Sequence, residues 1–221
     1  MAAGTAMLIA VVVLAAVVFA GGGTRGGKAG GSGTTRSSAP GLDSSALPAG
    51  AWQLPAGTRT DGVVRVGYPQ TALGAVAMAF NTIGAASTFD PSVLAAVQKA
   101  TALHPSSDIP AVAASETTAN RAAFGLPATG PSNATASTAI TGCKVLSAAP
   151  TKVVVVVEGQ IVESDPTHSE RVIPVVVPSV VVWNGDWKID AVATGSVNKP
   201  TATPPGPGGV SADGWHTCSV G

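Results

Sequence analysis

The feature that most constrains the fold is the stretch of residues 180–190, VVVWNGDWKID, in which an Asn-Gly pair separates two strand-forming segments. Such a pair is a strong signal for a β-hairpin, because both central residues of a type I′ turn need a positive φ angle. A two-residue loop of Asn184 and Gly185 would set the pairing of the two strands along their whole length. The sequence therefore predicts an antiparallel hairpin with a defined register.

This register assigns side chains to the two faces of the hairpin. Trp183 pairs with Asp186 and Val182 with Trp187, so the two tryptophans point to opposite faces. We predict that Trp187 lies on the core face, together with Val180, Val182, Ile189 and Ala191. The other face is more apolar than a solvated sheet face, which indicates an interaction surface covered by a partner, a second copy or the C-terminal tail. The residues of this predicted surface are Val175, Val177, Val181 and Trp183.

The period of two extends through the preceding segments. Strands are predicted over 140–148, 152–163, 171–183 and 186–193, joined by short turns, which makes an antiparallel meander. Glycine, proline and small polar residues fill the connector before the first of these strands.

Three helices are predicted before the strands. Thr71 is placed as the N-cap of the first helix, and Asp90, followed by proline, as the N-cap of the second. A third, alanine-rich helix is expected over 110–124, closed by Gly125 in the left-handed conformation. The predicted fold class is α+β, with two to three helices packed on a curved four-stranded antiparallel sheet over residues 63–198.

An apolar run at residues 6–20, extended to 1–23, approaches the length needed to span a bilayer. It is either a transmembrane anchor or a signal peptide cleaved after Ala20, and we favour the anchor. Arg25, Lys28 and Arg36 follow the run, which by the positive-inside rule would keep the domain in the cytoplasm. We nevertheless expect the domain outside the cytoplasm, at the cell membrane or secreted, because a basic leader upstream of Met1 would reverse that assignment.

Low-complexity segments flank the predicted domain. Residues 24–62 contain few large apolar groups and are predicted to form a flexible Gly/Ser/Pro-rich tether. Residues 199–221 form a Pro/Gly-rich tail, yet Trp215 near its end is too apolar for a solvated terminus. Trp52, within the tether, is expected either to dock on the domain or to lie at the membrane surface.

Cys143 and Cys218 are the two cysteines of the chain. They are too few for a zinc site and lack the CxxC spacing, so a disulfide that pins the tail is the specific hypothesis. The alternative is a pair of free buried thiols, and the choice follows from the orientation in the membrane.

The composition and the remaining motifs disfavour several functions. Charged residues make up 11% of the chain and the 12 basic residues balance the 12 acidic ones, which provides no basic face for nucleic acid. The acidic loop around His168, with Glu163, Asp165 and Glu170, lacks the spacing of a metal site and is predicted to be a solvated turn. No cofactor or metal is expected.

Catalysis is also disfavoured. There is no Gly-x-Ser-x-Gly motif, and none of the histidines has an evident acid or nucleophile partner. Tyr68 and Asp90 are the remaining candidates for acid/base chemistry, but Tyr68 precedes the first helix and Asp90 is already explained as a cap. We therefore expect a protein that is not an enzyme.

Two motifs carry a family resemblance. Residues 67–77, GYPQTALGAVA, and 183–188, WNGDWK, resemble actinobacterial envelope proteins that have an N-terminal anchor, a low-complexity tether and one α+β domain. Helices followed by a meander that ends in Trp-x-Gly-x-Trp also resemble the nuclear-transport-factor-2-like cone of periplasmic assembly factors in secretion and conjugation systems. The resemblance covers about residues 63–193 and implies no catalytic residue.

The resemblance and the tether together predict a non-enzymatic, membrane-anchored domain with a scaffolding or assembly role in the cell envelope. Its partners would be the membrane, envelope proteins or a second copy. The alternatives are a small-molecule binding module that uses the cone cavity and an isomerase-like enzyme.

Overall fold

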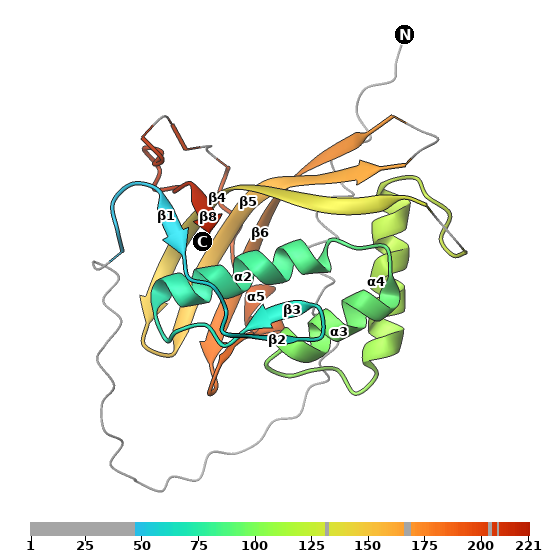
Figure 1. Cartoon of the computed structure of the whole chain (residues 1–221), viewed down its shortest axis with the longest axis horizontal. Coiled ribbons are helices and arrows are strands. Elements are labelled where there is room, and N and C mark those ends of the chain that lie inside the picture. Colours follow the sequence, from blue (N-terminus) through green and yellow to red (C-terminus); the bar gives the residue numbers. More distant parts are fainter. Residues whose placement is uncertain (1–46, 131–132, 166–168, 203–204, 207) are drawn as a thin grey trace, which may run out of the picture.

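The computed structural model describes residues 47–130, 133–165, 169–202, 205–206 and 208–221. The predicted membrane segment and most of the predicted tether lie outside these residues. Within them, no helix has the length and apolar character needed to cross a membrane. The described chain is an α+β structure, as predicted, and Figure 1 shows helices packed on one side of long curved strands.

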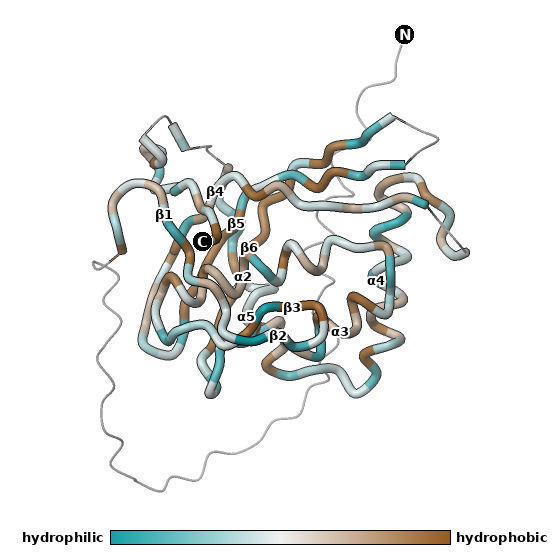
Figure 2. The backbone as a smooth tube through the Cα atoms, viewed as in Figure 1, coloured by the Kyte–Doolittle hydropathy of each residue, from teal (hydrophilic) through white to brown (hydrophobic). Residues whose placement is uncertain are grey.

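The main sheet is an antiparallel meander in the order β4-β5-β6-β7, which confirms the predicted four-stranded arrangement. Its strands are β4 (Thr135–Ala149), β5 (Lys152–Ser164), β6 (Arg171–Trp183) and β7 (Trp187–Ile189). Figure 2 shows the hydrophobic character of β5 and β6, which lie in the middle of the sheet. Two register shifts in β4, between Ile140 and Gly142 and between Val145 and Ser147, bend this edge strand.

The three predicted helices are present as α2 (Ala72–Ala86), α3 (Pro91–Thr101) and α4 (Ile109–Ala123). Thr71 caps α2 by accepting a hydrogen bond of 3.0 Å from the Gly74 amide. Asp90 caps α3 in the same way, with 2.8 Å to the Ser92 amide. Gly125 follows α4 with a φ of 69°, the left-handed conformation that glycine adopts without steric cost.

The fourth strand is shorter than predicted because a further helix begins directly after it. Asp190 accepts a hydrogen bond of 3.0 Å from the Ala193 amide and so caps the short helix α5 (Ala191–Thr194). The hydroxyl of Thr194 in turn accepts a bond of 2.8 Å from the Val180 amide of β6. This helix therefore stays attached to the sheet.

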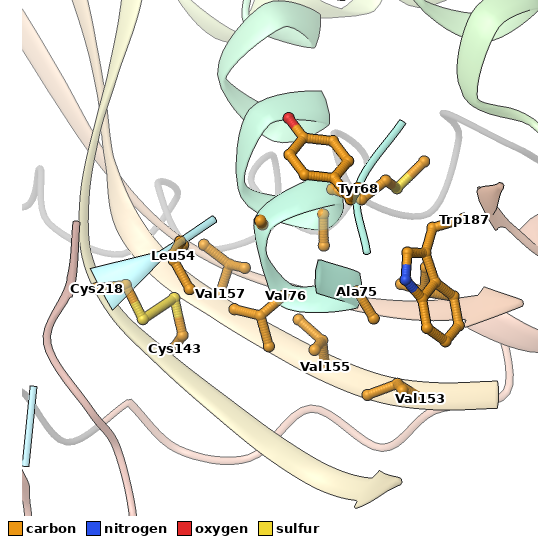
Figure 3. Packing of buried hydrophobic residues seen from close by; sticks show 14 of the residues in the cluster. Leu54, Tyr68, Ala75, Val76, Cys143, Val153, Val155, Val157, Trp187 and Cys218 are labelled. Carbon is orange, nitrogen blue, oxygen red and sulfur yellow. A yellow bond between two sulfur atoms is a disulfide. The ribbon is translucent and has the colours of Figure 1, made fainter. Parts of the chain in front are cut away.

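The largest core lies between α2 and one face of the sheet. Figure 3 shows Ala75 and Val76 of α2 facing Val153 and Val155 of β5, with Trp187 beside them. All five side chains are almost completely inaccessible to solvent. Small residues on α2 let the helix approach the valine-rich strands closely, so a core with few aromatic residues is still well packed.

Residues predicted to lie in the tether belong to the fold, which corrects the predicted domain start at Val63. Strand β1 (Trp52–Leu54) pairs in parallel with β8 (Cys218–Val220), and β2 (Arg59–Asp61) forms a hairpin with β3 (Val64–Val66). Trp52 and Leu54 are each 1% exposed and join the main core. Burial of these two large side chains offsets the cost of ordering a segment that is otherwise polar.

The tail packs on the opposite face of the sheet at β4. Trp215 is fully buried, and a Cβ on Gly142 of β4 would lie 3.5 Å both from its ring and from Pro205. Val156, which points away from α2 because it alternates with Val155 and Val157, is likewise fully buried.

The register of the β6–β7 hairpin differs from the prediction by one residue. Trp183 pairs with Trp187 and Val181 with Ile189, so the loop has three residues, Asn184 to Asp186. Among the described residues only glycines have positive φ, which excludes the type I′ turn because that turn would also need positive φ at Asn184.

This one-residue difference moves the predicted interaction surface to the helix-facing side of the sheet. Val181 is fully buried in the main core, and Trp183 packs against it. Val175 and Val177 belong to a second core cluster with Phe89, Phe124 and Ile161. The four residues are therefore not an outward surface, because a one-residue change of register exchanges the two faces of a strand.

Candidate functional site

A hollow of about 420 Å³ opens where the helices meet the beginning of the first long strand. Three segments that are distant in the sequence form it: the connection from α2 to α3, the last turn of α4 and the start of β4. We call this feature the hollow. Its lining residues are Thr88, Phe89, Asp90, Pro91, Arg121, Ala134, Thr135 and Ala136.

The second core cluster lies beneath the hollow. Phe89 and Phe124 contact each other edge to face, with ring centroids 5.6 Å apart and an interplanar angle of 76°. A minute cavity of about 10 Å³ beside the hollow shares Phe89 with it and reaches Ile161 of β5. The hollow therefore has an apolar floor that packs on the sheet.

Arg121 is the most unusual side chain in the wall of the hollow, because it is only 8% exposed. Its Nε donates a hydrogen bond of 2.6 Å to the Pro127 carbonyl, and its Nη2 donates one of 2.9 Å to the Gly130 carbonyl. In the part of the chain that the structure describes, no carboxylate lies within ion-pair distance of it. A guanidinium has five N–H donors, and among the described residues these two bonds account for two of them.

Asp90 brings the opposite charge to the same hollow. Its Oδ1 accepts from both the amide and the hydroxyl of Ser92, at 2.8 and 2.7 Å, and these bonds hold the pKa of Asp90 below its usual value. The carboxylate is fully solvent-accessible and ionised at neutral pH. The hollow thus combines a buried cation, an exposed anion and an apolar floor.

The predicted disulfide is present. Cys143 of β4 and Cys218 of β8 are bonded, with their Cα atoms 6.0 Å apart and 75 positions of sequence between them. Both cysteines are buried in the main core. The bond holds the end of the tail, and β1 through its pairing with β8, against the edge of the sheet.

Tyr68 and Asp90, the two residues considered for acid/base chemistry, do not share a site. Tyr68 is buried in the main core under α2, whereas Asp90 lines the hollow. Burial raises the pKa of Tyr68 to about 12, and the nearby charge of Arg65 acts in the opposite direction. Tyr68 is therefore a core residue and contributes nothing to the hollow.

The acidic loop is only partly described, since His168 lies outside the described residues. Glu163 at its start is buried, unlike a residue of a solvated turn, and sits in β5 opposite Arg171 of β6. Within the described ranges no three metal-ligating side chains come together.

Sequence reasoning missed Arg121. A basic residue in the last turn of a helix ordinarily complements the helix dipole, and this is how an arginine at that position is interpreted without a structure. The available signal was that Arg121 is the only charged residue between Glu116 and Lys144.

Another polar site that the sequence did not predict lies between α3 and α4. Glu116 is 2% exposed, and its Oε2 accepts a hydrogen bond of 2.7 Å from Gln98. Burial raises the pKa of Glu116 to about 8, so the side chain is mostly protonated at neutral pH. This carboxyl group lies away from the hollow and belongs to the helix packing.

The fold and these sites define a class: a small α+β domain with a disulfide-pinned tail and a hollow between its helices and the edge of its sheet. Residues 55–211 match the family described as a domain of unknown function (DUF8175), and the chain belongs to this family. The comparisons with curated proteins and with solved structures found no match.

Proposed function

We propose that this protein is a membrane-tethered, extracytoplasmic and non-enzymatic domain that acts in the cell envelope by binding. The observation that carries the location is the disulfide between Cys143 and Cys218. Disulfides persist in oxidising compartments and are rare in the cytosol, where thiols are kept reduced. The apolar run at residues 6–20 supplies the attachment to the membrane.

The site chemistry supports binding in preference to catalysis. The titratable side chains that line the hollow are Asp90 and Arg121. Asp90 is engaged as a helix cap with a lowered pKa, which suits it poorly to accept or donate protons at neutral pH. Arg121 offers N–H donors that suit recognition of an acceptor group.

Among binding roles, the hollow favours a small-molecule module. Its volume falls within the range of about 300–1,000 Å³ that is usual for small-ligand sites. Four of its eight lining residues carry polar or charged side chains that can bind the polar groups of a ligand. The residues that motivated a scaffolding role, Val175, Val177, Val181 and Trp183, lie on the helix-facing side of the sheet and pack in its cores.

An assembly role, related to conjugation or secretion, is the second candidate. It is favoured by the part of the long strands that extends past α2 in Figure 1, where Val172 of β6 is 47% exposed. Light scattering of the full chain in detergent tests self-assembly, and a monomer at all concentrations would count against a homo-oligomer.

Cysteine-accessibility labelling in intact cells tests the location. The two native cysteines are bonded to each other, so Ser32→Cys introduces a single free thiol into the tether. We expect an impermeant maleimide to label this variant in intact cells and to leave the unsubstituted protein unlabelled. Labelling that occurs only after lysis would refute the extracytoplasmic location.

A further inference from the structure

We propose that the hollow binds a small zwitterion, an α-amino acid with an apolar side chain, whose carboxylate contacts Arg121 and whose ammonium group faces Asp90. This inference deepens the proposed binding function and rests on it. It follows from the charges, the volume and the floor of the hollow taken together.

The buried guanidinium selects a carboxylate. A buried charge is costly unless it is paired, and Arg121 has two carbonyl partners but no described carboxylate partner. Its remaining N–H groups form the planar fork that binds a carboxylate through two parallel hydrogen bonds. A ligand carboxylate would complete the pairing that the described residues leave open.

Asp90 narrows the choice to a ligand that also carries a positive charge. It lines the same hollow as Arg121, yet the two side chains are not within ion-pair distance of each other. A purely anionic ligand at Arg121 would bring its charge toward the Asp90 carboxylate, and a phosphate dianion more so. A ligand with an ammonium group beside its carboxylate meets both side chains favourably.

The rest of the lining fits the remainder of such a ligand. The aromatic ring of Phe89 packs against Phe124 and lies in one cluster with Ile161. This apolar floor accommodates an apolar side chain of the ligand. The hydroxyl groups of Thr88 and Thr135 are further hydrogen-bonding groups in the lining. A volume of about 420 Å³ is ample for one amino acid with its water.

Equilibrium dialysis of the full chain in detergent tests the proposal with three radiolabelled probes of similar shape. Phenylalanine carries both charges, phenylacetate only the negative one and phenethylamine only the positive one. We expect phenylalanine to bind more tightly than either of the others. Phenylacetate should bind more weakly, and phenethylamine weakest, since it lacks the group that pairs with Arg121.

Two variants with a matched control assign the contacts. Asp90→Asn keeps an N-cap oxygen and removes the charge, so it should weaken phenylalanine binding about fivefold. It should tighten phenylacetate binding, because the repulsion between the two carboxylates is removed. Asp108→Asn makes the same change at the N-cap of α4, outside the lining, and should have no effect. Arg121→Lys should weaken phenylalanine and phenylacetate alike, by about tenfold, because lysine lacks the planar fork.

The outcomes separate this proposal from the function on which it rests. Equal binding of phenylalanine and phenylacetate, with loss of both in Arg121→Lys, would leave a binding hollow but overturn the zwitterion. Failure of phenylalanine to bind at about 10 mM would overturn the proposal too, because this concentration is well above the dissociation constants usual for so small a ligand. The Ser32→Cys labelling result is independent of either outcome.

Discussion

Trp183 and Trp187 lie opposite each other across the β6–β7 hairpin, with ring centroids 5.3 Å apart and an interplanar angle of 75°. Trp187 is fully buried and donates a hydrogen bond of 2.8 Å from its indole nitrogen to the Pro69 carbonyl, just before α2. Trp183 is half-buried and packs against Trp187 at the edge of the main core. The edge-to-face pair thus closes one end of the main core.

Asp186 secures the three-residue loop between these tryptophans. Its Oδ2 accepts from Arg59 and from the Gly67 amide, both at 2.9 Å, and its Oδ1 accepts from the Trp187 amide at 2.8 Å. Asp186→Asn replaces one acceptor oxygen by a donor that faces these groups, and we expect it to lower the free energy of unfolding by about 2 kcal/mol. Urea denaturation of both proteins measures this difference.

Arg59→Gln is the control for Asp186→Asn. The Arg59 side chain is 64% exposed, so its loss should cost well under about 1 kcal/mol. Similar losses in the two variants would mean that the ion pair, and not the two backbone amides, accounts for the role of Asp186.

Glu116→Gln should stabilise the protein at neutral pH. The pKa of Glu116 is about 8 in the folded state against 4.5 for an ordinary glutamate, so between these values the folded state binds more protons than the unfolded state. Stability contributed by this group is therefore present below about pH 4.5 and is lost as pH rises toward 8. By pH 7 the loss is about 3 kcal/mol at most.

The glutamine variant mimics the protonated acid, so its unfolding free energy should fall less steeply between pH 5 and pH 8 than that of the unsubstituted protein. Urea denaturation at several pH values measures both slopes, with Asp108→Asn as the control for an exposed acid. Parallel slopes would show that the pKa of Glu116 is not raised.

The disulfide should stabilise the fold by about 4 kcal/mol, because it restricts the unfolded chain over 75 positions. Cys218→Ser removes the bond, and we expect urea denaturation to show a loss of this size. Thiol titration of the denatured, unreduced protein should find no free thiol. Two free thiols in that titration would contradict the bond itself.

Trp215 should contribute mainly through its volume. It is fully buried on the outer face of the sheet, and its indole nitrogen has no hydrogen-bond partner in the described part of the chain. Trp215→Ala should therefore cost about 3 to 4 kcal/mol, whereas Trp215→Phe, which keeps most of the apolar contact, should cost about 1 to 2. Equal thermal stability of the two variants would argue against a tail packed on the sheet.

Much of the fold could be predicted locally. The N-caps Thr71 and Asp90 and the C-terminal Gly125 define helix ends through bonds to near neighbours in the chain, so residue type and order suffice. The meander followed from alternating valines. By contrast, β1 was missed because its three residues are stable only through pairing with β8, which lies more than 150 positions away in the sequence.

The candidate site could be predicted only in part. Asp90 was recognised as a cap, whereas the hollow beside it requires α4 and the start of β4 to meet the same loop. The residues next to Arg121 in the sequence do not indicate that its side chain is buried. Its environment is made by carbonyls of the connector after α4 and by residues of β4, so its role depends on contacts that the sequence does not specify.

The sequence by itself determined the three longer helices, the order of the four strands of the main sheet and the two cysteines available for a bond. Only the tertiary structure decided which face of the last hairpin is buried. Asn184-Gly185 favours a two-residue turn locally. Asp186 instead accepts hydrogen bonds from Arg59 of β2 and from Gly67, which follows β3, and these bonds hold it in the loop. Because strand faces alternate with a period of two, those long-range bonds place Trp183 beside Trp187 and turn a predicted surface into core.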